Sequence, residues 1–376
     1  MLNGNEFIYI ANIDIADKGY VTKIEGMLKA FRNIFNSTTL VIKNSLGADH
    51  SVITGADEVI SSKRLLYLYI NLVKVSVIKK PRLIYIRHPR LNPLYILTLL
   101  ITRLLSNNTN IVHELPTYPY DSEFELPRDG FKKIADLISR PFLKYCVNLV
   151  VYIGIKNKDS IFGVPSLQIR NGIDPFSFPM QIKSKKEDPI CLIGVGNLSE
   201  RHGYDRVIEG MRNYFQDNLA CRNIIFNIVG SGKEEIHLKE LALKYKLYGS
   251  SVIFYPPMYG EDLDKLFNKA DIGVGNLGFH RINVCHSSAL KEMEYLTRGI
   301  PILVSFDEEY PRILEQYLFY TNADDSPVDI KNLIDDYTKR SRFLAVNDIR
   351  TCAIDLFGWQ VVIDEIIIFF NIKITH

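Results

Sequence analysis

Short apolar runs alternate with helical patterns along almost the whole chain. The runs at residues 7–10, 39–42 and 81–86 each have the composition of a buried strand, and intervening residues such as 64–77 repeat their apolar positions at helical spacing. Strands that alternate with helices are typical of a parallel sheet covered by helices on both faces. Because the alternation restarts at residues 190–195, we predict an α/β fold made of two successive doubly wound units.

The segment 174–188 is rich in proline and lysine and breaks this pattern, so it is the best candidate for a linker. At roughly 100–200 residues per domain, a chain of 376 residues fits two domains. We therefore expect Rossmann-like domains over residues 1–180 and 189–355. Ligands of doubly wound sheets bind at the carboxyl ends of the strands, so a cleft between the two domains is the expected site.

Charge is distributed unevenly along the chain. Residues 1–180 contain 22 basic and 15 acidic residues, which leaves 23 basic and 28 acidic residues for the remainder. A basic N-terminal half indicates an anionic partner, such as a membrane surface or a phosphate-bearing acceptor. A chance imbalance on solvated faces is the alternative.

The cysteines and the apolar stretches indicate a cytoplasmic protein. None of the five cysteines forms a CxxC pair, so we expect reduced core residues. Polar residues at positions 3, 5 and 6 interrupt any signal peptide. The apolar stretch 91–105 is shorter than the ~20 residues of a membrane span and fits a buried or interfacial helix.

The segment 286–301, HSSALKEMEYLTRGIP, follows an apparent strand and has the pattern of a helix that ends at Gly299. Its first turns carry Ser287, Ser288 and Lys291. A helix N-terminus with hydroxyl and ammonium groups favours an anion. This segment is the first place to expect a phosphate.

Three further loops follow strands in the same half of the chain. Residues 194–203 include Asn197, Arg201 and His202, and residues 229–233 hold Gly230 and Lys233 between two apparent elements. The third loop, Tyr255-Pro-Pro-Met258, could hold a nucleobase through its backbone. Glycine turns expose N–H groups to a phosphate, although each turn alone is also an ordinary connection.

Taken in order, these loops resemble the donor domain of GT-B glycosyltransferases, and specifically the retaining GT4-like family (glycosyl transferases group 1) of bacterial polysaccharide biosynthesis. The resemblance covers nearly the whole chain. It rests on Arg170-Asn-Gly-Ile-Asp174, NLSERHGYDR at 197–206, Asn276-Leu-Gly278, the segment 288–301, and the loop 113–121, which is similar to E-x-P-T-x-P-Y-D. It implies two Rossmann-like domains that face each other across a cleft, and a final helix, residues 356–376, that crosses back to the N-terminal domain. A plain core or dimer helix is the alternative for that segment.

The resemblance also implies roles in donor binding. Glu294 matches the second acid of the family's E-x7-E motif, which hydrogen-bonds the ribose, whereas the first acid is replaced by His286. Lys291 matches a phosphate-facing lysine, and Arg201 and His202 fall where the family places a basic pair on the diphosphate. A histidine there keeps a donor without a guaranteed charge. Gly19 falls on a loop where the backbone approaches the donor.

In the N-terminal half, Arg87 and His88 end one apparent strand, and His113 and Glu114 end the next. We expect these four residues, with Tyr118, to serve acceptor binding and chemistry. The alternative, to which we give equal weight, is that each is a structural polar residue whose hydrogen bonds are satisfied within the fold.

The function predicted from the resemblance is a retaining glycosyltransferase. It would move a sugar from a UDP- or GDP-sugar to a lipid-linked or saccharide acceptor in O-antigen, capsule or exopolysaccharide synthesis, at the inner face of the cytoplasmic membrane. No metal, cofactor or nucleic acid is expected, because basic side chains and helix dipoles stabilise the leaving diphosphate. The alternatives are a non-catalytic nucleotide-sugar-binding relative and a GT-B nucleotide-sugar epimerase.

Overall fold

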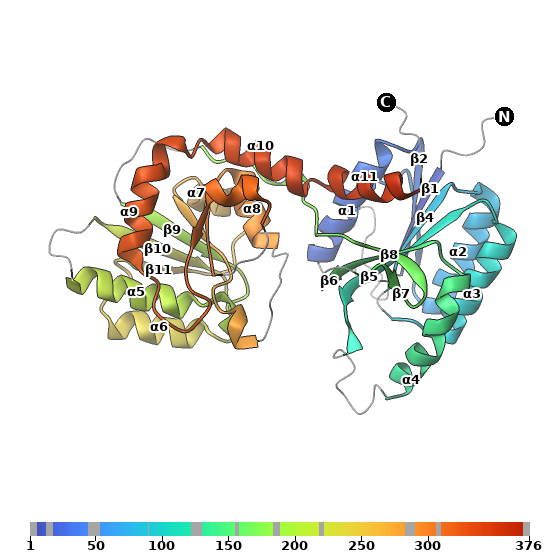
Figure 1. The fold of residues 1–376 in the computed structure, drawn as a ribbon, viewed down its shortest axis with the longest axis horizontal. Helices are drawn as coiled ribbons and strands as arrows, with labels where there is room; N and C mark the ends of the chain where they lie inside the picture. Colours follow the sequence, from blue (N-terminus) through green and yellow to red (C-terminus); the bar gives the residue numbers. More distant parts are fainter. Residues whose placement is uncertain are drawn as a thin grey trace. The chain divides into compact units, whose positions relative to one another are not determined.

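The computed structural model describes residues 6–12, 18–43, 53–88, 90–121, 130–154, 158–182, 189–217, 222–282, 290–305 and 310–370. The chain divides into two compact units (Figure 1). Unit 1 comprises residues 1–172 and 359–376, and unit 2 comprises residues 173–358. The unit boundaries therefore lie at Gly172 and Gly358, whereas the sequence suggested 180 and 355.

Unit 1 is built on a largely parallel sheet. Its strands are β1 (Glu6–Ala11), β2 (Ser37–Lys43), β3 (Glu58–Ser62), β4 (Leu83–Arg87), β5 (Asn110–Tyr118), β6 (Leu149–Gly154), β7 (Ser160–Ile161) and β8 (Val164–Gln168). They lie in the order β3-β2-β1-β4-β5-β6-β8-β7, and only the β7–β8 pair is antiparallel. The strand order reverses direction between β1 and β4, which makes this point of the sheet the natural ligand position.

Helices cover both faces of this sheet. One buried cluster joins α1 (Lys18–Arg32) and α11 (Trp359–Phe369) to the sheet, and a second joins α2 (Leu65–Lys79) and α3 (Pro93–Leu105) to the opposite face. Residues 130–145 form α4 (Gly130–Ser139) followed by a 3-10 segment, η4 (Arg140–Tyr145), because Pro141 has no N–H to continue the α-helix.

The ring of Trp359 fixes the start of α11 in unit 1. A Cβ atom on Gly26 of α1 would lie 2.3 Å from this ring, and one on Gly172 would lie 2.5 Å from it. Both glycines are therefore required by packing against the indole. The glycine of the Arg170–Asp174 motif thus serves the docking of the last helix.

Unit 2 has a fully parallel sheet of six strands. These are β9 (Ile190–Val195), β10 (Ile224–Val229), β11 (Val252–Tyr255), β12 (Ile272–Val274), β13 (Ile302–Val304) and β14 (Leu318–Tyr320), in the order β11-β10-β9-β12-β13-β14. The helices are α5 (Tyr204–Asp217), α6 (Glu235–Lys244), α7 (Glu261–Phe267), α8 (Leu290–Arg298), α9 (Ile330–Arg340) and α10 (Val346–Phe357). Short 3-10 segments are η5 (Pro175–Ser177), η6 (Glu200–His202), η7 (Phe279–Ile282), η8 (Arg312–Tyr317) and η9 (Ser341–Phe343).

The first part of the predicted linker is packed on unit 2. The side-chain amide of Gln181 donates to the carbonyl oxygens of Phe267 and Ala270, at 2.7 and 2.5 Å, and its backbone N–H donates to Arg298. Gln181 is buried, so these bonds satisfy carbonyls that end α7. This packing explains why the unit boundary lies before residue 174; residues 183–188 lie outside the described part of the chain.

Candidate functional site

The strand order of unit 2 reverses between β9 and β12, so ligands are expected at the carboxyl edge of these strands. Because all six strands are parallel, the loops after β9, β10, β11 and β12 lie at one edge of the sheet. The structure places most of the predicted donor residues in these loops: Asn197, Arg201 and His202 after β9, Gly230 and Lys233 after β10, and Met258 after β11. Asn197, Arg201 and Lys233 are exposed, and Met258 is partly buried.

The glycine turns let the backbones of neighbouring loops approach one another. Gly230 has a φ of +134°, and a Cβ atom there would lie 1.9 Å from the carbonyl oxygen of Gly196. Neither the dihedral angle nor the space permits a side chain. A Cβ on Gly196 would lie 3.0 Å from Nε2 of His202, so this glycine keeps the face of that histidine open.

His202 is a buried, neutral histidine held by η6. The backbone N–H of Ser199 donates to its Nδ1 at 3.1 Å, in a capping arrangement at the start of η6. Burial, together with the nearby charges of Lys291 and Arg201, lowers the pKa of His202 to about 2. A neutral imidazole whose Nδ1 accepts carries its proton on Nε2, and that nitrogen lies beside Gly196. The ring therefore presents an N–H donor beside the first glycine turn.

Lys291 lies in the first turn of α8 and reaches the loop after β12. Its Nζ donates to the carbonyl of Gly275 at 2.9 Å and to the hydroxyl of Tyr204 at 3.3 Å. Burial lowers the pKa of Lys291 to about 7, against the raising influence of Glu292. An anionic ligand at this edge would restore the charged form.

Glu292 is a buried carboxylate beside the candidate site that sequence reasoning missed. It is 5% exposed, and its Oε1 accepts from the backbone N–H of Asn276 at 2.9 Å and from the Asn276 side chain at 3.3 Å. The hydroxyl of Tyr310 donates to Oε2 at 2.8 Å. Burial raises the pKa of Glu292 in spite of these bonds. The sequence KEME holds the feature that could have pointed to Glu292. Its two acids are two residues apart, so on a helix they face different sides, and only one of them can match the family's acid.

Glu294 lies one turn after Lys291 and is partly buried. Its Oε1 accepts from Nε of Arg298 at 2.9 Å, and Arg298 also pairs with Asp264 of α7 at 2.7 Å. Burial raises the pKa of Glu294, and Arg298 opposes this shift. Arg298 therefore orients the carboxylate of Glu294, and Asp264 in turn holds Arg298 in place.

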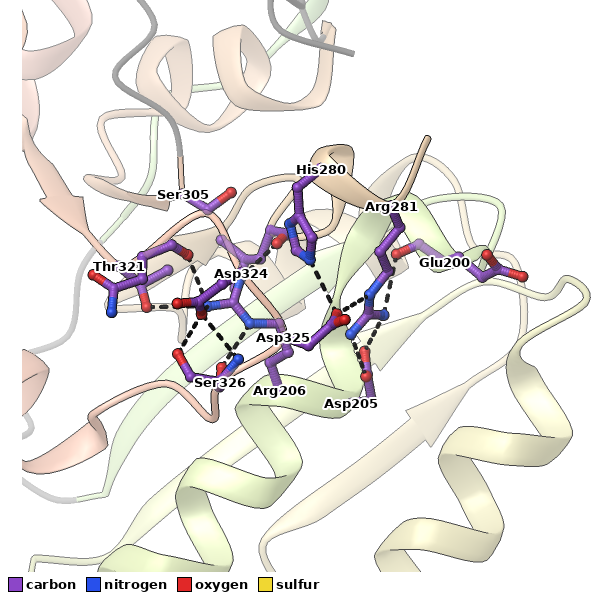
Figure 2. A network of polar contacts seen from close by, with 12 residues as sticks. Glu200, Asp205, Arg206, His280, Arg281, Ser305, Thr321, Asp324, Asp325 and Ser326 are labelled. Atoms are coloured by element: carbon purple, nitrogen blue, oxygen red, sulfur yellow. Dashed lines mark hydrogen bonds and ion pairs between the residues drawn. The ribbon is translucent and has the colours of Figure 1, made fainter. Parts of the chain in front are cut away.

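Arg206 is a second residue whose role was not foreseen. Its guanidinium group, shown in Figure 2, is fully buried and donates to carbonyl oxygens of two separate loops. It donates to Leu277 at 2.6 Å, Ser326 at 2.8 Å and Asn322 at 2.8 Å. The side chain ties the start of α5 to the loop after β12 and the loop after β14. Arg206 is the last residue of the 197–206 motif, and no sequence pattern predicts its burial.

Arg281 completes the polar network of Figure 2. Its two Nη atoms pair with the carboxylate of Asp205 at 2.9 and 2.7 Å, and its Nε donates to Asp325 at 2.7 Å. His280 lies 3.0 Å from the same Asp325 oxygen. Bidentate arginine–carboxylate pairs fix orientation as well as distance. These pairs hold η7 against α5. They therefore join the segment that follows β12 to the segment that follows β9.

The remaining predicted residues of the site are the catalytic candidate His286 and the donor-binding candidates Ser287, Ser288 and Gly19. His286, Ser287 and Ser288 lie in the segment 283–289, outside the described residues, so their predicted roles stay predictions. Gly19 lies in the first turn of α1, not in the loop before it as the sequence suggested. Its backbone therefore belongs to a helix N-terminus.

The predicted acceptor residues lie at the carboxyl edge of the unit 1 sheet, where two of them form a buried ion-pair cluster. Glu114 is 0% exposed and pairs with Nζ of Lys23 at 2.8 Å and with Nη1 of Arg87. Burial would raise the pKa of Glu114, but these two cations outweigh it and hold the pKa below its ordinary value. Lys23 also donates to Asn171 of the Arg170–Asp174 motif at 3.2 Å. This cluster thus combines two basic side chains with one acid.

His88 and His113 lie on the opposite face of the sheet, because neighbouring residues of a strand point to opposite sides. Nδ1 of His113 is 3.0 Å from the hydroxyl of Tyr95, whose ring stacks on His88 at 4.4 Å. Burial lowers the pKa of His113 to about 3 and that of His88 to about 4, so both are neutral near pH 7. His113 and Glu114 are fully buried, which favours the structural alternative for these two residues, and Arg87 and His88 are 4% exposed.

Nε2 of His88 contacts the side chain of Asn12 at 3.1 Å, at the end of β1. His88 therefore lies where the strand order of unit 1 reverses. Tyr118 ends β5, is partly buried and packs edge-on against Tyr152.

Comparison with known proteins agrees with this architecture. Residues 177–344 match the model of the family described as glycosyl transferases group 1. Among curated proteins, none matches the sequence significantly.

Solved structures share the fold of the whole chain. A sucrose-phosphate synthase from Thermosynechococcus elongatus aligns with a TM-score of 0.61 at 13% identity, over 97% of this chain and 98% of its own. The Anabaena protein HepE, solved in complex with UDP-glucose, aligns with a TM-score of 0.59 at 13% identity, over 97% and 99%. A lipopolysaccharide outer core galactosyltransferase aligns with a TM-score of 0.57 at 12% identity, also over 97% and 99%.

At these identities the structural likeness establishes the fold, and the likeness to the glycosyl transferases group 1 family is confined to the matched segment. That segment contains the loops after β9, β10, β11 and β12 and helix α8. Residues 177–344 thus resemble the glycosyl transferases group 1 family, within a chain of GT-B fold.

Proposed function

We propose that the protein is a glycosyltransferase whose nucleotide-sugar donor binds at the carboxyl edge of the unit 2 sheet. The observation that carries the proposal is the convergence of a neutral His202, Lys291 and two glycine turns at the reversal of strand order. Groups that donate to a diphosphate are thereby gathered within the matched segment. A nucleoside diphosphate as leaving group needs this kind of cationic and N–H-donating surface.

Within this proposal, the diphosphate lies against Gly196, Nε2 of His202 and Nζ of Lys291. Arg201, Asn197 and Lys233 are exposed around it, and the backbone at Gly230 and Met258 faces the nucleoside. Glu294 accepts hydrogen bonds from the ribose hydroxyls, since a carboxylate can accept two bonds from a diol. A UDP- or GDP-sugar is the proposed donor, and the UDP-glucose bound to the similar Anabaena protein supports the first of these.

We also propose that the transfer retains the anomeric configuration. The bond between the anomeric carbon and the phosphate oxygen breaks, and a bond from the acceptor oxygen to that carbon forms on the same face. The acceptor proton passes to the departing diphosphate, so no separate base is required. His286 and Gly19 are the further candidates for contact with the donor sugar.

The acceptor is proposed to meet unit 1, whose edge carries Arg87, His88 and Tyr118. The net positive Lys23–Glu114–Arg87 cluster supports an anionic acceptor, such as a lipid-linked saccharide at the cytoplasmic face of a membrane. The similar lipopolysaccharide galactosyltransferase supports a role in bacterial surface polysaccharide synthesis. Glu114 and His113 would act through the position of Arg87 and Tyr95 and not on the acceptor itself.

The activity is tested by incubating the protein with a panel of UDP- and GDP-sugars, with and without membrane lipid extracts, and by separating the products. Release of nucleoside diphosphate together with a glycosylated lipid or saccharide is expected. Conversion of one nucleotide sugar into another would indicate an epimerase. Tight nucleotide binding without turnover on any acceptor would indicate a non-catalytic relative; either outcome refutes the proposal.

The role of Glu294 has its own test. Calorimetric titrations compare UDP with 2′-deoxy-UDP on the wild type, on Glu294→Ala and on the control Glu240→Ala, which removes an exposed carboxylate from α6. The wild type and the control should prefer the ribonucleotide by about tenfold, the value of one hydrogen bond to a charged group. Glu294→Ala should lose this preference. An unchanged preference would remove Glu294 from the ribose site.

A further inference from the structure

The surface of helix α3 that faces solvent is apolar. Leu94, Leu97, Ile101 and Leu104 are all exposed, Leu104 at 79%, and their spacing places them in one stripe along the helix. The single charged residue of α3, Arg103, donates to the carbonyl of Thr109 and to Asn148 beside the sheet. An exposed helix stripe normally carries charged and polar residues, so this one indicates a contact surface.

The neighbouring helices extend this surface. Helix α3 packs against both α2 and α4, and Figure 1 shows the three helices on one flank of unit 1. Further exposed apolar side chains are Leu66, Tyr67, Ile70, Val77 and Ile78 on α2, Phe131, Ile134, Leu137 and Ile138 on α4, and Phe142 and Tyr145 on η4. We call this surface the α2–α4 face. Phe131 is 89% exposed, which leaves an aromatic ring almost entirely in solvent.

The charges on the α2–α4 face are basic. Helices α2 and α3 contain no Asp or Glu. The single acid of α4, Asp136, is 0% exposed and accepts from the backbone of Leu91 and the hydroxyl of Tyr120. The exposed charges of α4 are Lys132 and Lys133. Apolar and cationic groups therefore share this face without exposed acids on its three helices.

This combination distinguishes between two possible occupants. A symmetric dimer through the α2–α4 face would place the same basic residues of both copies close together, which is unfavourable. A bilayer rich in anionic lipid offers an apolar layer below a negative surface and complements both properties. Helix α3 has 13 residues, about 20 Å, which is shorter than the ~30 Å hydrocarbon core. Among the described residues, no helix is long and apolar enough to cross a membrane.

We propose that the α2–α4 face docks on an anionic lipid bilayer, with the apolar side chains of α3 and α4 inserted below the headgroups and the lysines on the lipid phosphates. The proposal deepens the proposed function, on which its biological sense rests, because a lipid-linked acceptor is found only at such a surface. It names the part of the chain that meets the membrane and the two forces that hold it there.

Binding is tested by flotation of the purified protein with vesicles of phosphatidylcholine alone and of phosphatidylcholine with phosphatidylglycerol. The wild type should float with the anionic vesicles and remain behind with the neutral ones. Replacement of two leucines by Leu97→Ser and Leu104→Ser should lower the partition coefficient about thirtyfold, since each loses about half the transfer energy of a leucine side chain. The control, Ile236→Ser with Leu243→Ser on α6, removes equally exposed apolar groups from unit 2 and should bind as the wild type does.

A second variant tests the electrostatic part with no change to apolar residues. Lys132→Gln with Lys133→Gln should also lower binding about thirtyfold, and 1 M salt should abolish this difference because it screens the lysines. Failure of the wild type to float with anionic vesicles, or equal flotation of the lysine variant and the wild type at low salt, would overturn the proposal. A dimer in light scattering that the leucine substitutions dissociate would assign the face to a second copy instead.

Nucleotide titrations on the same samples separate this proposal from the proposed function. Loss of vesicle binding with unchanged nucleotide affinity in the variants is the expected result. A wild type that floats with vesicles but binds no nucleotide would refute the donor site while leaving the docking face in place.

Discussion

Binding of a nucleotide sugar should draw a proton onto Lys291. Burial at the start of α8 lowers the pKa of this lysine to about 7, so a large fraction of it is neutral in the free protein at pH 8. A diphosphate beside Nζ favours the ammonium form and raises the pKa in the complex. A nucleotide sugar is the right ligand, because its diphosphate diester does not change charge between pH 6 and pH 9.

The size of the effect follows from the pKa. With a pKa of about 7 in the free protein and above about 9 in the complex, binding should take up about 0.1 proton at pH 6, about 0.5 at pH 7 and about 0.9 at pH 8. The affinity should be nearly constant below pH 6 and fall about fiftyfold between pH 7 and pH 9. The sign is fixed because the ligand prefers the protonated form, which the free protein loses as the pH rises.

Calorimetric titrations at pH 6, 7 and 8 in buffers of different ionisation enthalpy measure this uptake directly. Lys291→Met should abolish it and make the affinity independent of pH over this range. Lys265→Met, which removes an exposed lysine of α7, is the matched control and should keep the full uptake. Absence of proton uptake at pH 8 in the wild type, or the same uptake in Lys291→Met, would refute the placement of the diphosphate on this lysine.

Three further predictions concern stability and metal ions. Arg206→Met removes the donor from three carbonyl groups, of which that of Leu277 is buried, and should lower the free energy of unfolding by about 3–5 kcal/mol in denaturant titrations; a change below about 1 kcal/mol would contradict the role of this network. Glu114→Gln should cost about 3–5 kcal/mol at pH 7, because it leaves Lys23 and Arg87 buried without their anion, whereas Glu58→Gln at an exposed pair should cost less than about 1 kcal/mol. Folding lowers the pKa of Glu114, so its contribution to the free energy of unfolding is complete above the ordinary pKa of 4.5 and is lost as the pH falls through the pKa of the folded protein. The free energies of unfolding of Glu114→Gln and Glu58→Gln should therefore converge in acid. EDTA should leave transfer unchanged, and recovery of activity only after added magnesium or manganese would contradict metal independence.

The alternation of strands and helices predicted most of the fold, because continuous apolar runs between amphipathic segments leave few architectures open. The strands that escaped prediction are short or marginal. β3, with the sequence EVISS, is the edge strand next to β2 and has a polar end, so it carries neither a long apolar run nor clear alternation. The boundary at Gly172 was missed because the bonds of Gln181 to α7 are contacts distant in sequence.

The loops of the candidate site could be located from the sequence, but the roles of single side chains could not. In KEME, burial of Glu292 and the pairing of Glu294 with Arg298 depend on which face of α8 packs on the sheet. In the same way, His113 and Glu114 are adjacent in sequence but lie on opposite faces of the unit 1 sheet, and one of them is held by a lysine 91 residues away. Long-range partners of this kind leave no local pattern.

We propose above that the carboxyl edge of the unit 2 sheet binds a nucleotide sugar through its diphosphate. A crystal structure of the protein with a bound UDP- or GDP-sugar tests it most directly. We expect the diphosphate within hydrogen-bond distance of Nε2 of His202 and Nζ of Lys291, with the ribose hydroxyls on Glu294. A nucleotide bound elsewhere on the chain, or bound at this edge without contact to any of the three, would contradict it.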